Sequence, residues 1–324
     1  MTVKYLIGTD EAGYGPNLGP LVVSTSVWQV PEGTDGENLY DLLAEVVSQT
    51  PGRVKQTDRP VAVADSKKLY SPSKGLQHLE RGLWAALNTL GRTADNWSGL
   101  FNALAPGSLD DLKTIPWYAD YERTLPLDFA AEQLDALNGK FQDGLTDADV
   151  RLVELRSSVV FPGRFNRLVD QHASKGTALS NITFDLLSQV MQPLGNAPIS
   201  IVCDKHGGRN RYGQILGEHF PDHLIEVHGE GRKKSTYRFG PADRRVKISF
   251  VSKGESHLPA ALASMASKYL RELAMRAFND FWQAKVPDLR PTAGYPQDAK
   301  RFKAEIADAQ AALDIDDEIL WRNR

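Results

Sequence analysis

The sequence predicts an α/β fold, because short β-branched runs and longer segments of helical periodicity alternate along the chain. Residues 3–9 and 199–203 are two such runs, and residues 257–284 form the longest helical segment. The composition is that of a globular protein, with 41% hydrophobic and 24% charged residues. A length of 324 residues allows two domains or one large domain with insertions.

The N-terminal part supplies the first strands and helices. Its expected elements are strands at 3–9, 21–28 and 61–64 and helices at 38–48 and 71–90. The first strand ends at the acidic pair Asp10 and Glu11, and a Gly/Pro-rich turn leads to the second. Ser71 and Pro72 provide an N-cap and a first-turn proline, so we expect the longer helix to begin there.

The middle of the chain is rich in aromatic and acidic residues. Residues 96–160 contain three prolines, and residues 108–154 hold eleven Asp and Glu against four Lys and Arg. After this stretch we expect helices at 165–174, 178–191 and 212–219 and a buried strand at 199–203. Asp204 therefore lies at the C-terminal end of a strand.

The last third is divided by charge. Residues 232–253 carry eight Lys and Arg and one acid, a charge of +7, interleaved with three aromatic residues. Residues 246–251 alternate as in a strand, which suggests a hairpin. The long helix 257–284, a Pro/Gly-rich loop and a helix at 297–313 follow, and residues 304–321 hold six acids and no base.

Composition also excludes several classes of protein. The lone Cys203 rules out an internal disulfide and argues against a cysteine zinc site, which suits a reducing compartment. Residues 1–8 lack the apolar region of an export signal, and no apolar stretch approaches the roughly 18 residues of a membrane span. We expect a cytoplasmic protein without membrane contact. The net charge of −3 does not by itself indicate a nucleic-acid binder.

The stretch 8–20 is the first candidate site, because two acids end a strand and three glycines follow. Carboxylates are hard ligands that suit Mg²⁺ or Mn²⁺, and glycines let backbone N–H groups approach a ligand closely. A dinucleotide site is disfavoured by the G-x-G-x-x-x-G spacing and by Pro16, which interrupts it. On residue types alone, a hairpin turn with solvated acids is the favoured interpretation of the stretch.

The same stretch, Asp10-Glu11-Ala12-Gly13-Tyr14-Gly15-Pro16, resembles the first motif of the ribonuclease HII family, Asp-Glu-Ala/Val-Gly-Arg-Gly-Pro. Four further motifs of that family are matched in order: Asp65-Ser66-Lys67-Lys68-Leu69; Asp204 with a Gly-Asn-Arg-like stretch at 207–211; Lys253-Gly254-Glu255-Ser256 with 263–272; and Gly294-Tyr295-Pro296. The chain is therefore similar to a divergent member of the family.

The departures from the family pattern are specific. Tyr14 stands where the family has Arg, and Glu272 stands where ribonuclease HII has Asp, a change that resembles ribonuclease HIII. The resemblance implies one ribonuclease H-like α/β domain with a central mixed sheet flanked by helices, over residues 1–284. Insertions are expected at about 30–60, 92–160 and 227–246, and residues 285–324 would form a C-terminal loop, helix and acidic tail packed on the domain.

The resemblance also implies a two-metal site and a substrate surface. Two Mg²⁺ or Mn²⁺ ions would be held by Asp10, Glu11, Asp204 and Glu272, the four catalytic carboxylates. The implied substrate-binding residues are Gly13, Tyr14 and Gly15 at the ribose 2′-hydroxyl, Tyr295 against a sugar, and Ser66, Lys67, Lys68, Lys253 and Lys268 along the phosphates. Four carboxylates without a metal would raise one another's pKa, so the set makes most sense as a cation cage.

Each of these residues also has a simpler interpretation. Glu272 alone would pair with Lys268 or Arg276 on the helix surface, and Tyr295 would pack under its loop. Asp65 and Ser66 could form only a turn, Lys67 and Lys68 a solvated pair, and residues 232–253 a solvated hairpin.

The implied activity is endonucleolytic cleavage of RNA in RNA/DNA hybrids, or at ribonucleotides embedded in duplex DNA, by a monomer. The products would carry 3′-hydroxyl and 5′-phosphate ends. One alternative is a nuclease of shifted specificity, and another is a non-catalytic protein that binds nucleic acid or a basic partner. A Rossmann-type nucleotide enzyme is a third and more distant alternative.

Overall fold

The computed structural model describes residues 3–52, 60–130, 133–172 and 174–323. The other positions, which fall at the chain ends and within the expected segments 30–60, 92–160, 165–174 and 285–324, lie outside the described residues. No helix in the described ranges is long and apolar enough to cross a membrane.

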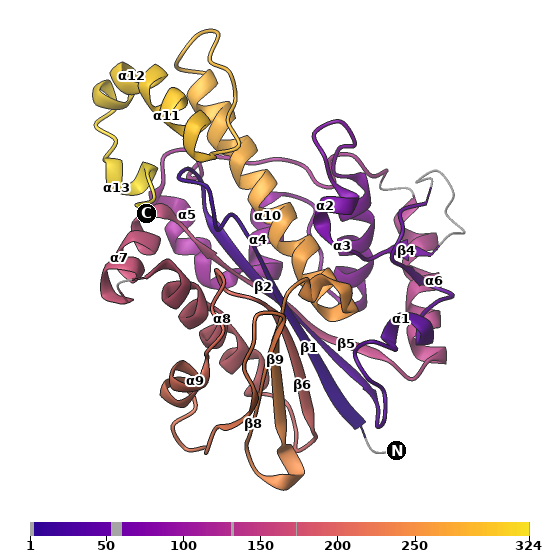
Figure 1. Cartoon of the computed structure of the whole chain (residues 1–324). Helices are drawn as coiled ribbons and strands as arrows, with labels where there is room; N and C mark the ends of the chain where they lie inside the picture. Colours follow the sequence, from indigo (N-terminus) through magenta and orange to yellow (C-terminus); the bar gives the residue numbers. More distant parts are fainter. Residues whose placement is uncertain (1–2, 53–59, 131–132, 173, 324) are drawn as a thin grey trace.

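A seven-stranded mixed sheet forms the centre of this part of the chain, in the order β5-β2-β1-β6-β9-β8-β7 (Figure 1). Its strands are β1 (Val3–Ala12), β2 (Leu21–Pro31), β5 (Arg151–Val160), β6 (Ile199–Asp204), β7 (Glu226–Gly229), β8 (Lys234–Phe239) and β9 (Val246–Val251). β1, β6 and β9 are parallel neighbours, and the remaining pairs are antiparallel. β3 (Val47–Ser48) and β4 (Val61–Ala62) form a separate parallel pair. The expected α/β class with a central mixed sheet is confirmed.

Helices cover both faces of the sheet. The long helix α10 (Leu258–Gln283) crosses β1 and β2 on one face, and α8 (Lys175–Met191) covers the other face (Figure 1). The alternation of the strands explains this division, because successive side chains point to opposite faces. Leu6 packs in the core cluster that contains α10, whereas Ile7 and Ile201 pack with Phe184 of α8.

The remaining helices surround this core. They are α1 (Leu39–Leu42), α2 (Ser66–Leu69), α3 (Gln77–Thr89), α4 (Trp97–Leu104), α5 (Leu109–Thr114), α6 (Leu134–Asp147), α7 (Pro162–His172), α9 (Gly213–His219), α11 (Pro296–Glu305), α12 (Ala307–Ala312) and α13 (Asp317–Leu320), with short 3₁₀ turns η1 (Pro106–Ser108), η3 (Ala242–Arg244) and η4 (Gly254–Ser256).

Three sequence predictions differ from the structure. The helix expected at 38–48 ends at Leu42, because the β-branched Val47 pairs with Val61 in the small sheet. The helix expected from residue 71 begins at Gln77, since a turn closed by hydrogen bonds to the Ser71 carbonyl precedes it. β5 was not predicted, although it pairs with β2 along the whole strand, so the end of the expected insertion 92–160 belongs to the sheet.

The C-terminal part returns to the start of the chain. After α10 the chain forms α11, α12 and α13, and Trp321 then pairs as an isolated bridge with Leu18 in the loop between β1 and β2. Figure 1 shows α13 beside α7, and Asp317 of α13 accepts hydrogen bonds from Lys303 of α11 and Gln310 of α12, at 2.6 and 2.9 Å. Residues 317–323 therefore lie against the Gly-rich loop that follows Asp10 and Glu11.

Candidate active site

Asp10 and Asp204 lie at the ends of adjacent parallel strands. Thr9 of β1 pairs with Cys203 of β6, so the next residue on each strand carries its carboxylate to the same edge of the sheet. One oxygen of Asp204 accepts hydrogen bonds from the backbone N–H groups of Lys253 and Gly254, at 3.1 and 3.2 Å. The strand register thus brings together two of the four predicted catalytic acids.

Burial and mutual repulsion act on this acidic pair and on Glu11. Burial, opposed by a hydrogen bond from Ser264 and reinforced by the charges of Asp204 and Glu255, raises the pKa of Asp10 to about 7. Burial, with the charges of Asp10 and Asp204, also raises the pKa of Glu11 well above its usual range. Such a group of acids favours anything that supplies positive charge, a proton or a metal ion.

Glu255 is a member of this cluster that the sequence reasoning did not select. It lies in η4, directly after the two residues that hydrogen-bond Asp204. A Cβ on Gly254 would lie 3.0 Å from the backbone nitrogen of Asp204, so the turn packs closely against the end of β6. The sequence does carry a signal for Glu255, because the residue stands inside the Lys-Gly-Glu-Ser motif. Of that motif, only Lys253 was predicted as a site residue.

Glu272, the fourth predicted acid, is held on α10 by two neighbours. The Tyr70 hydroxyl donates to one carboxylate oxygen at 2.6 Å, and Lys268, one turn earlier, donates to the other at 2.5 Å. The simpler interpretation of a pair with Lys268 is therefore realised in this structure, with Tyr70 as an additional partner.

The chemistry of the acids fits a divalent cation, although their side chains are spread apart. Carboxylate oxygens are the ligands that Mg²⁺ and Mn²⁺ prefer. Burial, and after it the charges of neighbouring carboxylates, raises the pKa of Asp10 and of Glu11. Across the described residues, no three or more His, Cys, Asp or Glu side chains are grouped closely enough to hold a metal ion. The acids would have to draw together around an ion.

The backbone of residues 13–15, which follows Asp10 and Glu11, adopts a conformation that suits glycine. Gly13 has a φ of +90°, and a Cβ there would lie 2.6 Å from the Pro20 carbonyl oxygen. Tyr14 packs under Lys175, whose ammonium group lies 5.2 Å from the ring centre and donates to the Tyr14 carbonyl at 3.2 Å. Burial and the charge of Glu11 raise the pKa of Tyr14, and Arg209 opposes them.

Tyr295 lies beside the same loop. Its ring approaches Gly15, where a Cβ would be 3.9 Å from it, and the residue remains 59% exposed. The alternative in which Tyr295 packs under its own loop is therefore wrong. An exposed ring at this position is available to stack on a ligand.

The predicted lysines occupy three kinds of position. Ser66 and Lys67 begin α2, which contacts α10 through a hydrogen bond from Ser264 to the Ser66 hydroxyl at 3.1 Å. Burial lowers the pKa of Lys67, but Asp65, Glu255, Asp10 and Asp204 together raise it above its usual value, which places this cation beside the acidic cluster. Exposed side chains at Lys68 and Lys253 extend outward, whereas Lys268 is paired with Glu272.

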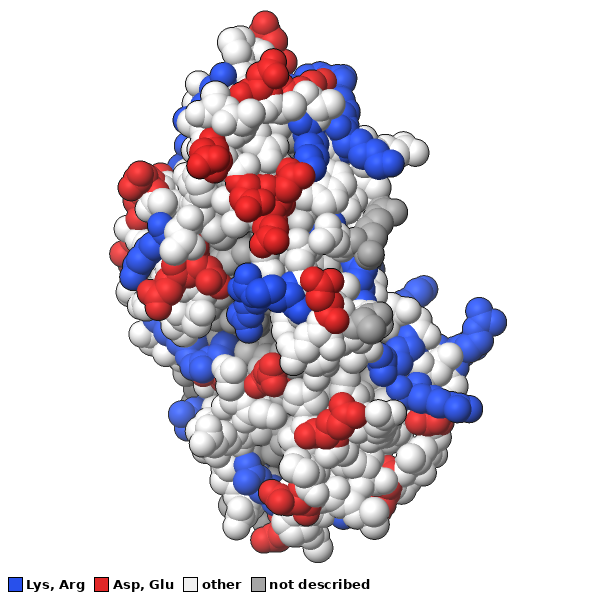
Figure 2. Space-filling model, turned by 90° about the vertical axis from the view of Figure 1, so that its left-hand side faces the viewer, with Lys and Arg blue, Asp and Glu red and all other residues white. Residues whose placement is uncertain are grey.

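The basic segment 232–253 is a hairpin with two different faces. Arg238 pairs with Lys247 across β8 and β9, and both are exposed. The interleaved aromatic residues Tyr237, Phe239 and Phe250 are buried on the other face. They belong to the core and cannot stack on bases, so only the cations of this segment are exposed for contact with a ligand. On the side shown in Figure 2, cations and acids are intermixed rather than separated into one basic surface.

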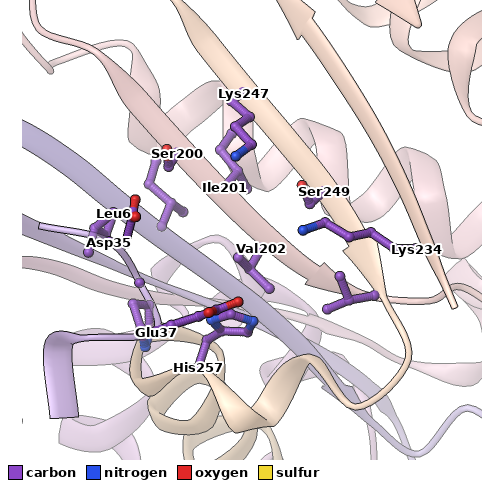
Figure 3. Close-up of a pocket in the computed structure, with 14 residues that line it drawn as sticks. Leu6, Asp35, Glu37, Ser200, Ile201, Val202, Lys234, Lys247, Ser249 and His257 are labelled. Carbon is purple, nitrogen blue, oxygen red and sulfur yellow. The ribbon is translucent and has the colours of Figure 1, made fainter. Parts of the chain in front are cut away.

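A separate cavity of about 160 Å³ lies on the sheet beside these strands (Figure 3). Lys234 and Lys247 reach toward it from β8 and β9, and Glu37 and His257 stand opposite. Asp10, Glu11 and Asp204 do not line it. The cavity is therefore distinct from the candidate active site.

Comparison with known proteins concerns the fold. No family model and no curated protein sequence matches the chain. Among solved structures, it is similar to ribonuclease H2 from Pyrococcus horikoshii, at 15% identity over 98% of this chain and 92% of that one, with a TM-score of 0.46. It is also similar to ribonuclease HII from Archaeoglobus fulgidus, solved in complex with PCNA (15%, 98% and 94%, 0.43), and to ribonuclease H3 from Aquifex aeolicus (15%, 98% and 71%, 0.43).

The expected class, an α/β fold with a central mixed sheet flanked by helices, is confirmed by the sheet and the helices on its two faces, and the resemblance to ribonuclease HII stays a prediction from the sequence motifs. The reaction has to be argued from the side chains.

Proposed function

We propose that the protein is a metal-dependent endoribonuclease that cleaves RNA in RNA/DNA hybrids or at ribonucleotides embedded in duplex DNA. The observation that carries the proposal is the group of half-buried acids Asp10, Glu11 and Asp204, which repel one another at one sheet edge next to a Gly-rich loop. A protein that needed these acids only for stability would gain nothing from their repulsion.

Asp10, Glu11 and Asp204 would hold the metal, with Glu272 or Glu255 as a further ligand. Two bound Mg²⁺ or Mn²⁺ ions would supply the positive charge that activates water and stabilises the leaving 3′ oxygen. Glu255 already acts on Asp10 in this structure, whereas Glu272 would have to exchange its contacts with Tyr70 and Lys268. The products would carry 3′-hydroxyl and 5′-phosphate ends.

The residues around the acids would orient a ribose-containing strand. The backbone of residues 13–15 could approach the strand closely, because two of its three residues are glycines without side chains. The exposed Tyr295 ring lies beside Gly15. Lys67 stands next to the acidic cluster and Lys253 at the turn beside Asp204. Lys175 and Arg209 lie near Tyr14, where they supply positive charge that the family's Arg would bring.

Cleavage assays test the proposal. We expect the parent protein to cut an RNA/DNA hybrid, or a duplex with a single ribonucleotide, in Mg²⁺ or Mn²⁺ and not in EDTA. Asp10→Asn and Asp204→Asn should each lose activity by at least about a hundredfold, since each removes charge where the metals bind. Asp110→Asn on α5, an exposed acid that pairs with Lys113, is the control and should cut like the parent. Failure of the folded parent to cut either substrate would refute the proposal.

Tyr14 in place of Arg favours one second candidate, a nuclease of the same chemistry with shifted specificity. A matched all-DNA duplex separates the two. Equal cutting of the all-DNA and ribonucleotide-containing duplexes would establish the shifted specificity.

A further inference from the structure

Arg322 is a buried cation whose hydrogen bonds go to the candidate substrate loop. The residue is 1% exposed, and one guanidinium nitrogen donates to the Gly13 carbonyl at 2.6 Å and to the Pro16 carbonyl. Its Nε and second terminal nitrogen have no hydrogen-bond partner among the described residues. Taking a guanidinium group out of water is unfavourable, so a buried arginine of this kind calls for an explanation.

Independent contacts hold the segment that carries Arg322. Its backbone N–H donates to the Asn17 carbonyl at 2.8 Å, and the Asn17 side chain donates back to the Arg322 carbonyl at 2.9 Å. On the other side, the Asn166 amide donates to the Trp321 carbonyl and accepts from the Asn323 N–H, both at 2.8 Å. The guanidinium group also lies over the Phe165 ring, 4.9 Å from its centre. The position of Arg322 is thus determined from both flanks.

A second buried arginine supports the same loop from α10. Arg271 donates to the Pro20 carbonyl at 2.5 Å and to the Leu18 carbonyl at 3.2 Å. Together the two arginines bind four carbonyl groups within residues 13–20 of the loop between β1 and β2. Arg322 binds the half of the loop nearer to the acids.

The planarity of the peptide bond converts this contact into an orientation. The Gly13 carbonyl and the Tyr14 N–H belong to one rigid peptide plane and point in opposite directions. When Arg322 binds the Gly13 oxygen, the Tyr14 N–H is turned away from the guanidinium group. Gly13, with its φ of +90°, has the conformational freedom to lose this orientation if the carbonyl is released.

We propose that Arg322 is a positioning residue for ribonucleotide recognition, which fixes the Tyr14 amide at the angle needed to contact a ribose 2′-hydroxyl. The inference rests on the proposed function. Arg322 lies outside every matched motif, yet the inference gives it a part in distinguishing RNA from DNA. It follows that residues 317–323 must pack against the loop for this discrimination to work.

Arg322→Met tests the role, because it keeps an apolar stem of similar length over Phe165 and removes the donors. Arg92→Met is the matched control: Arg92 donates to the carbonyls of Ala103 and Leu155, at 3.1 and 2.8 Å, and pairs with Glu154, away from the loop. The readout is the ratio of kcat/KM for a single-ribonucleotide duplex to that for the matched all-DNA duplex.

We expect Arg322→Met to lower this ratio by about tenfold or more, the effect of a misplaced contact, and Arg322→Lys to restore part of it. Arg92→Met should lower the melting temperature and leave the ratio within about twofold of the parent. If the ratio is as well preserved in Arg322→Met as in Arg92→Met, Arg322 is only structural and the inference is wrong.

Amide hydrogen exchange separates this inference from the proposed function. Peptides covering residues 12–19 should exchange faster in Arg322→Met and unchanged in Arg92→Met, whether or not the protein cuts nucleic acid. A parent that cuts neither duplex would refute the proposed function, and the role in recognition with it. Unchanged exchange of the loop in Arg322→Met would overturn the positioning itself.

Discussion

Replacing Gly8 with alanine probes the packing that places α10 beside the acids. A Cβ at this position of β1 would lie 2.6 Å from the Ala260 Cα, and closer still to Ala260 N and Pro259 C. All three are backbone atoms in the first turn of α10, so no side chain can rotate away. Ordinary contact begins at 3.4 Å and the closest of these atoms, Ala260 N, would lie 2.0 Å away, so the helix has to retreat by more than about 1 Å.

The structure sets the size of the effect. Overpacking costs about 1–3 kcal/mol, and the rigid backbone puts Gly8→Ala at the upper end. The retreat also stretches the hydrogen bond from the Ser26 hydroxyl to the Pro259 carbonyl, now 2.7 Å, which adds about 1 kcal/mol. Ser267 of α10 donates to the Asp10 carbonyl at 3.0 Å, so the same shift displaces groups around Asp10. A misplacement of about 1 Å lowers activity by about a hundredfold.

Urea unfolding and hybrid cleavage, measured on the same preparations, check both numbers. The control is Gly139→Ala in α6, where an added Cβ meets nothing within 4 Å. Alanine should stabilise that helix by about 0.5–1 kcal/mol. If Gly8→Ala changes the free energy of unfolding by less than about 1 kcal/mol, the close approach of α10 to β1 is wrong.

The other predictions concern single buried or strained groups. The buried carboxylate of Glu80 accepts the backbone N–H groups of residues 127–129 and the Tyr269 hydroxyl, two hydrogen bonds on each oxygen. Glu80→Gln therefore leaves two donors without an acceptor and should cost about 1–3 kcal/mol in urea unfolding; unchanged stability would contradict this network. Lys253 has a φ of +68°, a conformation that glycine adopts without strain, so Lys253→Gly should raise stability by about 1 kcal/mol. The loss of the cation should weaken hybrid binding and reduce its salt dependence. A lower melting temperature would speak against strain at this position. Cys203 is fully buried, so a thiol reagent should label it only as fast as the protein unfolds, and rapid labelling of the native protein would show that β6 is more open than described.

Local pattern was enough to predict the centre of the fold. The first two strands, β6, β9 and α10 were placed within a few residues, because each carries a run of apolar residues with the period of its own secondary structure. β5 escaped prediction because charged and hydroxyl side chains at 151, 154 and 156–158 interrupt its apolar positions. Its partner β2 lies more than a hundred residues earlier, and pairing with it is what makes the segment a strand.

The candidate site divides in the same way. Strand-end acids and glycines are local features, so Asp10, Glu11, Asp204 and the Gly13–Gly15 stretch could be selected from the sequence alone. The tertiary structure decided that Glu255 acts on Asp10, that Glu272 is held by Tyr70 and Lys268, and that Tyr295 is exposed. It alone placed Arg322 against Gly13. A contact between residues about 300 positions apart leaves no periodicity in the chain, because it depends on how the sheet, α7 and the C-terminal segment pack together.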